Sequence, residues 1–111
     1  MARDRYLIEW IDWTDWSANP CIYWIYEIDT SFSSYPANYI YTKEVSHHLW
    51  TPLYIGETPD ASTVSNGHKG RDCAIRNGAT HVHLHKSSGI KAERMREKKQ
   101  LIQRWSPICR C

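Results

Sequence analysis

The segment Pro52–Thr58 joins a tyrosine and a glycine to a signal for the start of a helix. Leu53 and Ile55 are expected on one side of a strand and Tyr54 on the other. The residues at 58–60 are typical of an N-cap, a first helical proline and a first-turn acid. A tyrosine hydroxyl beside a helix N-terminus is well placed to hold a phosphate, since free N–H groups and the helix dipole favour anions. The alternative is a surface tyrosine before an ordinary turn.

Histidines occupy every second position from His81 to His85. This alternation predicts a strand from Thr80 to Lys86, with the apolar residues facing the core and the histidines on the opposite face. Three imidazoles on one face could bind a metal ion or a phosphate. The favoured alternative is a row of histidines that faces solvent.

Glu97 lies in the strongest predicted helix, Lys91–Trp105. This helix has an apolar arc at 100° per residue, formed by Ile90, Leu101, Ile102 and Trp105. Glu97 borders the arc beside Leu101, and a carboxylate at the edge of a buried face needs a partner. It either pairs with Arg94 or another basic group, or it holds a divalent cation, for which a carboxylate oxygen is a suitable ligand.

Four cysteines are present, at positions 21, 73, 109 and 111. The N-terminus lacks the uncharged apolar run of a signal peptide, so reduced thiols in a cytoplasmic protein are expected. A zinc site built from Cys109, Cys111 and histidines is a weaker alternative, because a Cys-x-Cys pair lacks a second matching pair. No apolar run approaches the ~20 residues of a membrane span, so no membrane partner is expected.

These residues must be positioned by a small set of elements. The first part of the chain is expected to form a Trp-rich helical or wrapped cover within 1–19 and a strand over 21–28 that is apolar on both faces. Strands over 39–45 and from 52 follow. The remainder is expected to form a helix over about 68–76, a strand over 80–86 and a helix over 91–105. The predicted fold is of the α/β (α+β) class. It has a small, mainly antiparallel, three-stranded central sheet with room for an inserted hairpin, flanked by helices. The chain of 111 residues is one domain, with a cover at 1–19 and a core at 20–111.

Charge is distributed unevenly along the chain. Residues 1–67 carry three Lys/Arg and nine Asp/Glu, a net charge of −6, whereas residues 68–111 carry eleven and three, a net of +8. This asymmetry suggests an electropositive face for a polyanion, although an acidic half packed on a basic half gives the same counts. The 13% aromatic content, with six Trp and seven Tyr, argues against disorder.

Five features follow one another in an order and at spacings that resemble the GIY-YIG nuclease family over about residues 20–110. Pro20-Cys21-Ile22-Tyr23 stands in place of its Gly-Ile-Tyr strand, and Tyr54-Ile55-Gly56 is its second motif. His68 stands at the place of its helix histidine, and Gly78–His83 resembles its third strand. Glu97, followed by Leu101-Ile102 and Pro107, resembles its metal-binding glutamate and the residues after it.

The resemblance implies a metal-dependent endonuclease that hydrolyses DNA phosphodiesters. Tyr23 and Tyr54 would lie near the scissile phosphate, one helping to deprotonate the attacking water, with His68 assisting. Glu97 would anchor one Mg²⁺ or Mn²⁺ ion. These parts fit phosphoryl transfer, which depends on positioning and charge stabilisation. A tyrosine base would need help from the metal, the histidine or a cation, since its ordinary pKa is about 10.

The chain also departs from the family's pattern. The position of the family's helix arginine, ten residues after Tyr54, is Val64, and the gap from Tyr23 to Tyr54 is longer than usual. We expect Arg71 to take the arginine's catalytic place, with Arg76 as the other candidate. Cys21 replaces the first glycine, and Cys109 or Arg110 the C-terminal asparagine.

Contacts with nucleic acid are expected from four basic residues, Lys69, Arg76, Arg94 and Lys98. A homodimer or a partner domain would supply specificity. The alternative function is a catalytically degenerate member that acts as a nucleic-acid-binding or protein-interaction module.

Overall fold

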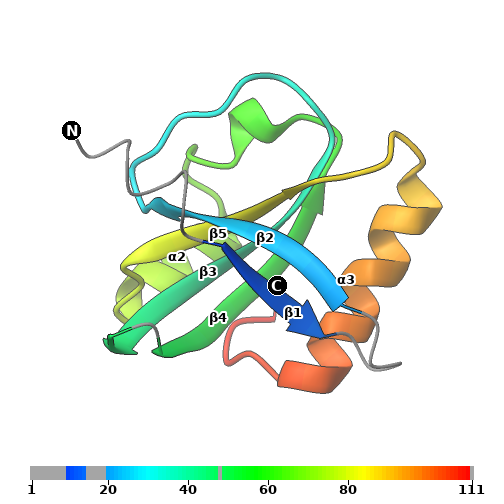
Figure 1. The fold of residues 1–111 in the computed structure, drawn as a ribbon. Helices are drawn as coiled ribbons and strands as arrows, with labels where there is room; N and C mark the ends of the chain where they lie inside the picture. Colours follow the sequence, from blue (N-terminus) through cyan, green and yellow to red (C-terminus); the bar gives the residue numbers. More distant parts are fainter. Residues whose placement is uncertain (1–9, 15–19, 48, 111) are drawn as a thin grey trace.

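The computed structural model describes residues 10–14, 20–47 and 49–110, which form one five-stranded antiparallel sheet in the order β1-β2-β5-β3-β4 (Figure 1). The strands are Trp10–Thr14 (β1), Pro20–Glu27 (β2), Ala37–Ser46 (β3), Leu49–Thr58 (β4) and His81–Lys86 (β5). The helices are Ala61–Thr63 (η1, a 3₁₀ turn), Lys69–Arg76 (α2) and Lys91–Trp105 (α3). The predicted, mainly antiparallel sheet flanked by helices is confirmed, but it has five strands and not the three expected for its centre.

The two longer helices pack on opposite faces of this sheet. Tyr39 and Ile40 are neighbours on β3, so their side chains point to opposite faces. Tyr39 belongs to a buried cluster with Ala74 of α2, whereas Ile40 belongs to a second cluster with Leu101 of α3. Figure 1 shows α2 behind the sheet, with α3 at its right-hand side. We refer below to the α2 face and the α3 face.

The histidines of β5 do not form a solvent-facing row, so that expectation is wrong. β5 is the central strand, paired with β2 on one side and β3 on the other. His83 is 0% exposed, and the ring of Trp50 packs against His81 and His83 with centroids 4.9 and 4.6 Å apart. Strict alternation describes a strand correctly, but it cannot show that both faces are covered.

A β-bulge changes the expected faces of β4. Tyr41 pairs with Tyr54 but Thr42 pairs with Pro52, so Leu53 is the extra residue. As a result Leu53 packs in the same cluster as Tyr54, while Ile55 packs in the other cluster. The prediction that Leu53 and Ile55 share a face is therefore wrong, because alternation fails at a bulge.

The expected N-terminal helix is not present at residues 10–14, which form β1 and pair with β2 in the register Trp10↔Trp24. The remainder of the cover lies outside the described residues. Pairing makes β2 an internal strand, yet Ile22 and Trp24 are substantially exposed, so among the described residues its outer face is not buried as expected.

The helix expected from Thr58 is replaced by an extension of β4 and the short turn η1. Asp60, not Thr58, is the N-cap of η1, and its Oδ1 accepts a hydrogen bond from the Ser62 amide at 3.0 Å. The next helix, α2, ends as expected at Asn77 and Gly78, whose φ of 92° suits glycine. α3 has the predicted bounds, although Ile90 is exposed instead of joining the apolar arc.

Cys73 of α2 and Cys109 of the C-terminal tail form a disulfide. The prediction of reduced thiols is therefore wrong for this pair, and Cys109 is not available as a zinc ligand. Cys111 lies outside the described residues. Within the part of the chain that the structure describes, neither helix combines the length and apolar character needed to cross a bilayer.

Candidate functional site

The sheet separates the two tyrosines that were expected at one site. Tyr54 packs on the α2 face, in the cluster that contains Tyr39 and Ala74. Tyr23 packs on the α3 face, with Leu101. The predicted catalytic set therefore divides into two groups on opposite sides of a β-sheet, and Tyr23 and Tyr54 cannot touch the same phosphate.

On the α2 face, Tyr39, Tyr54 and His68 form what we name the tyrosine–histidine cluster. Its three ring centroids make a nearly equilateral triangle, with 6.1 Å between the tyrosines, 6.1 Å from Tyr39 to His68 and 6.0 Å from Tyr54 to His68. The residues come from β3, β4 and the start of α2. Tyr39 was not predicted as a site residue, and it takes the place expected for Tyr23.

Two glycines allow these rings to come together. Gly56 lies opposite Tyr39 in the β3–β4 ladder, and a Cβ at Gly56 would be 2.6 Å from Cζ of Tyr39. Gly70 of α2 lies against the ring of Tyr54, where a Cβ would be 2.5 Å from Cε2. Real side chains do not approach so closely, so each position needs glycine for the cluster to exist as it stands.

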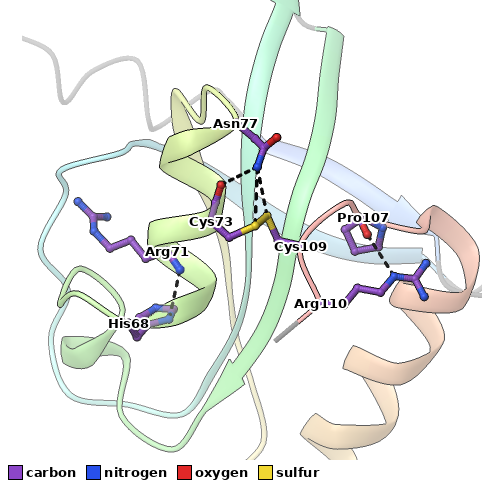
Figure 2. Close-up of a disulfide and its surroundings, with 7 residues drawn as sticks. All are labelled: His68, Arg71, Cys73, Asn77, Pro107, Cys109 and Arg110. Atoms are coloured by element: carbon purple, nitrogen blue, oxygen red, sulfur yellow. Dashed lines mark hydrogen bonds between the residues drawn. A yellow bond between two sulfur atoms is a disulfide. The ribbon is translucent and has the colours of Figure 1, made fainter.

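His68 is the N-cap of α2, as Figure 2 shows, and its Nδ1 accepts a hydrogen bond from the Arg71 amide at 3.3 Å. The neutral ring therefore carries its proton on Nε2. That Nε2 is buried without a hydrogen-bond partner. Burial, with a smaller effect from the charge of Arg71, lowers the pKa of His68 below its usual 6.5, and the charge of Asp72 and the nearby Val64 carbonyl oppose this only in part. At neutral pH His68 is thus an unsatisfied hydrogen-bond donor.

The neighbouring tyrosines are donors as well. Burial, followed by the proximity of Tyr54, raises the pKa of Tyr39 far above 10. Burial also raises the pKa of Tyr41, which lies next to the cluster and donates a hydrogen bond to the Val64 carbonyl. Hydroxyls that hold their protons this firmly suit the binding of an anion better than the removal of a proton from water.

Arg71 supplies a cation at the edge of the cluster. Its Nη1 donates to the carbonyl of Ile28 at 3.3 Å and to the hydroxyl of Tyr41 at 3.5 Å, and Nη2 lies 3.6 Å from the exposed carboxylate of Asp29. Val64, at the position of the family's arginine, is buried in the same cluster of side chains. Of the two expected substitutes, Arg71 is the one at this site. Arg76 lies at the far end of α2.

Glu97 lies on the other face with Tyr23. Its Oε2 accepts a 2.5 Å hydrogen bond from the Tyr23 hydroxyl and lies 3.0 Å from Nδ1 of His85. Like Tyr39, His85 was not expected at its site, since no sequence pattern connects it with Glu97. Glu97 and His85 border a hollow of about 250 Å³ at the start of α3, which is also lined by Glu93 and Ser88.

The residues present do not fit the expected Mg²⁺ or Mn²⁺ ion beside the tyrosine–histidine cluster. Glu97 is across the sheet from that cluster, and one of its oxygens is already engaged by Tyr23 and His85. Over the described ranges, no group of three His, Cys, Asp or Glu side chains converges as a metal site would require.

The four expected nucleic-acid contacts do not form one surface. Lys69 and Arg76 are exposed on α2, and Lys98 is partly exposed on α3. Arg94 is only 3% exposed, since its Nε pairs with Glu57 at 3.0 Å and its Nη1 donates to the Ser88 carbonyl. Arg94 therefore anchors α3 to β4. Further exposed basic residues of α3 are Lys91, Arg96, Lys99 and Arg104.

One sequence signal could have identified Tyr39. The gap from Tyr23 to Tyr54 is longer than is usual in the GIY-YIG family, and Tyr39, on the strand paired with β4, stands only 15 positions before Tyr54.

Searched against known proteins, the chain matches no family model, no curated protein and no solved structure.

Proposed function

We propose that the protein binds the phosphodiester backbone of nucleic acid, most readily DNA, and holds a phosphate at the tyrosine–histidine cluster. The observation that carries this proposal is the buried Nε2 of His68, a hydrogen-bond donor with no acceptor. A buried unsatisfied donor is costly, and an anionic oxygen is the acceptor that would gain most from it.

The surroundings of His68 support an anionic ligand. The rings of Tyr39 and Tyr54 lie with their centroids 6.1 and 6.0 Å from that of His68, and Arg71 adds positive charge beside Tyr41, next to the cluster. Lys69 and Arg76 are exposed on the same helix, where they can contact neighbouring phosphates. The α2 face thus combines a central donor group with basic residues around it.

Cleavage of the bound phosphodiester, as in the GIY-YIG family, is the second candidate. It is favoured by the meeting of two strand tyrosines and a helix histidine, the residue types that the resemblance implies. In this version His68 and Arg71 stabilise charge on the phosphoryl oxygens, and Tyr39 takes the role first expected of Tyr23. No step is derived through a metal ion, because Glu97 lies on the other face.

The test compares exposed basic residues of α2 with exposed basic residues of α3. In dithiothreitol, binding of a duplex DNA oligonucleotide is measured against salt concentration for the wild type, for Lys69→Gln with Arg76→Gln, and for the matched pair Arg96→Gln with Lys99→Gln on α3. The α2 pair should weaken binding and reduce the salt slope by about one for each phosphate that is no longer neutralised. The α3 pair should change binding much less. The reverse ranking would show that the phosphates lie on α3.

Nicking of supercoiled plasmid in Mg²⁺, Mn²⁺ or EDTA separates binding from cleavage. The binding proposal expects retained, salt-sensitive binding without nicking in all three conditions. Nicking that is lost in Tyr54→Phe would establish the second candidate instead.

A cytoplasmic location belongs to the same proposal. Thiols are kept reduced in that compartment, so the Cys73–Cys109 bond would be a transient feature there.

A further inference from the structure

The disulfide connects α2 to the C-terminal tail, which lies along β4, the strand that carries Tyr54. Cys109 lies in the tail after α3, and this tail is held along β4 by the hydrogen bond from the Cys109 amide to the Leu53 carbonyl at 2.9 Å and by the bridge Tyr54↔Cys109. Cys73 lies on α2, one turn after Gly70. Figure 2 shows the sulfur bridge running from α2, which also bears His68 and Arg71, to the tail.

With this bond in place, α2 closes over the tyrosine–histidine cluster. Gly70 packs on the ring of Tyr54, which is 8% exposed, and the Nε2 of His68 has no solvent access. A phosphate cannot reach these donors unless α2 moves. The disulfide-bonded structure is therefore the closed form of the site.

Apart from the disulfide, α2 is held by Arg71, which donates to the Ile28 carbonyl and the Tyr41 hydroxyl, and by its packing against the sheet. The helix has only eight residues, and its buried residues are Gly70 and Ala74. Helices this short are marginal by themselves and depend on tertiary contacts. A segment with so little buried surface is a natural candidate for local opening once a covalent tie is removed.

We propose that the Cys73–Cys109 disulfide is a redox latch that keeps α2 closed over Tyr54 and His68, and that its reduction opens the site. Opening frees the Nε2–H of His68 and the Tyr54 hydroxyl to meet a phosphate oxygen. The latch itself follows from the connections of α2. Its effect on ligand binding rests on the proposed function.

The chemistry requires an external dithiol reductant. Cys73 is partly exposed and Cys109 is buried, so a thiolate of the reductant attacks the Cys73 sulfur and Cys109 leaves as a thiolate, which takes up a proton. The second thiol of the reductant then displaces Cys73 from the mixed disulfide. The dithiol is oxidised to a disulfide, and two electrons and two protons pass to the protein.

Hydrogen exchange tests the latch without reference to function. Amide exchange is followed by mass spectrometry for the oxidised wild type, the wild type in dithiothreitol, and Cys73→Ser. On reduction, exchange over Lys69–Arg76 should accelerate about tenfold or more while β5 stays protected. Cys73→Ser should match the reduced wild type and should not respond to dithiothreitol.

Two results would overturn the latch. Unchanged protection of α2 on reduction would show that the bond does not hold the helix closed. Loss of protection in β5 together with α2 would show that the bond maintains the whole fold. Duplex DNA binding is measured in parallel, and the reduced protein should bind several-fold more tightly. If α2 opens without any gain in binding, the latch stands and the phosphate site fails.

Discussion

Tyr39 and Tyr54 stand on adjacent strands with their ring centroids 6.1 Å apart, and both rings reach over Gly56. This pair, and not Tyr23 with Tyr54, is the tyrosine pair that meets His68 at the start of α2. The arrangement depends on close approach at two glycines and on the position of α2, and both dependences can be tested by substitution.

Gly70→Ala should destabilise the protein, although alanine favours helix more than glycine does. A methyl group at this position would overlap the ring of Tyr54, and overpacking of this kind costs about 1–3 kcal/mol. Urea unfolding measures the change. Gly67→Ala is the matched control, since no other atom lies within 4 Å of a Cβ there and its stability should stay within about 0.5 kcal/mol of wild type. Equal effects of the two substitutions would contradict the packing of Gly70 on Tyr54.

Arg94→Met should lower the free energy of unfolding by about 3 kcal/mol, because it leaves the nearly buried carboxylate of Glu57 without its partner. Lys99→Met on the exposed side of the same helix should leave stability almost unchanged. Thermal or urea unfolding of both variants checks this. A neutral Arg94→Met would mean that the ion pair does not anchor α3, and Arg94 would again be a candidate for contact with nucleic acid.

Stability should fall as the pH is lowered from 6.5 because of His83. Burial, with a smaller effect from His81, lowers the pKa of His83 to about 3 in the folded protein. Below pH 6.5 the unfolded chain binds a proton at this residue that the folded protein does not, so stability is lost at up to about 1.4 kcal/mol per pH unit until the pH nears 3. Above pH 6.5 this contribution is constant.

Urea unfolding between pH 6.5 and 5.0 measures this slope for the wild type and for His83→Gln, which can keep a hydrogen bond to the Thr42 hydroxyl. The slope of unfolding free energy against pH should be shallower in the variant, by an amount that corresponds to about one proton fewer taken up on unfolding. An identical slope in both proteins would exclude His83 as the cause and would point to His68, whose lowered pKa acts in the same direction.

Local residue patterns correctly predicted where α3 begins and ends and where α2 ends. The bounds of α3 follow from its apolar arc and from Ser106-Pro107, where Ser106 adopts φ 47° as the C-cap. The end of α2 follows from Asn77-Gly78 in the same way. The N-terminal strand could not be predicted like this, because tryptophans at every third position suit a helix, whereas pairing with β2 decides the conformation of residues 10–14.

Only part of the candidate site could be predicted, again because pairing between strands is not visible in the sequence. Tyr54 and His68 were found because a short motif carries them, but the face on which a side chain lies depends on register. The register Tyr39↔Gly56 and Tyr41↔Tyr54 places Tyr39 on the face of Tyr54, whereas the pairing of β2 with β5 places Tyr23 on the other face. The disulfide was out of reach as well, since four cysteines allow three pairings and only the fold brings Cys73 to Cys109.

The most direct measurement is an NMR titration of the histidine side chains with a short duplex DNA, in dithiothreitol. Free His68 is expected to be neutral with its proton on Nε2, and its ring resonances should shift and saturate with the same Kd as overall binding. The rings of His83 and His85, on the α3 face, should stay nearly constant. Saturable binding that leaves His68 unchanged would contradict a phosphate site at the tyrosine–histidine cluster.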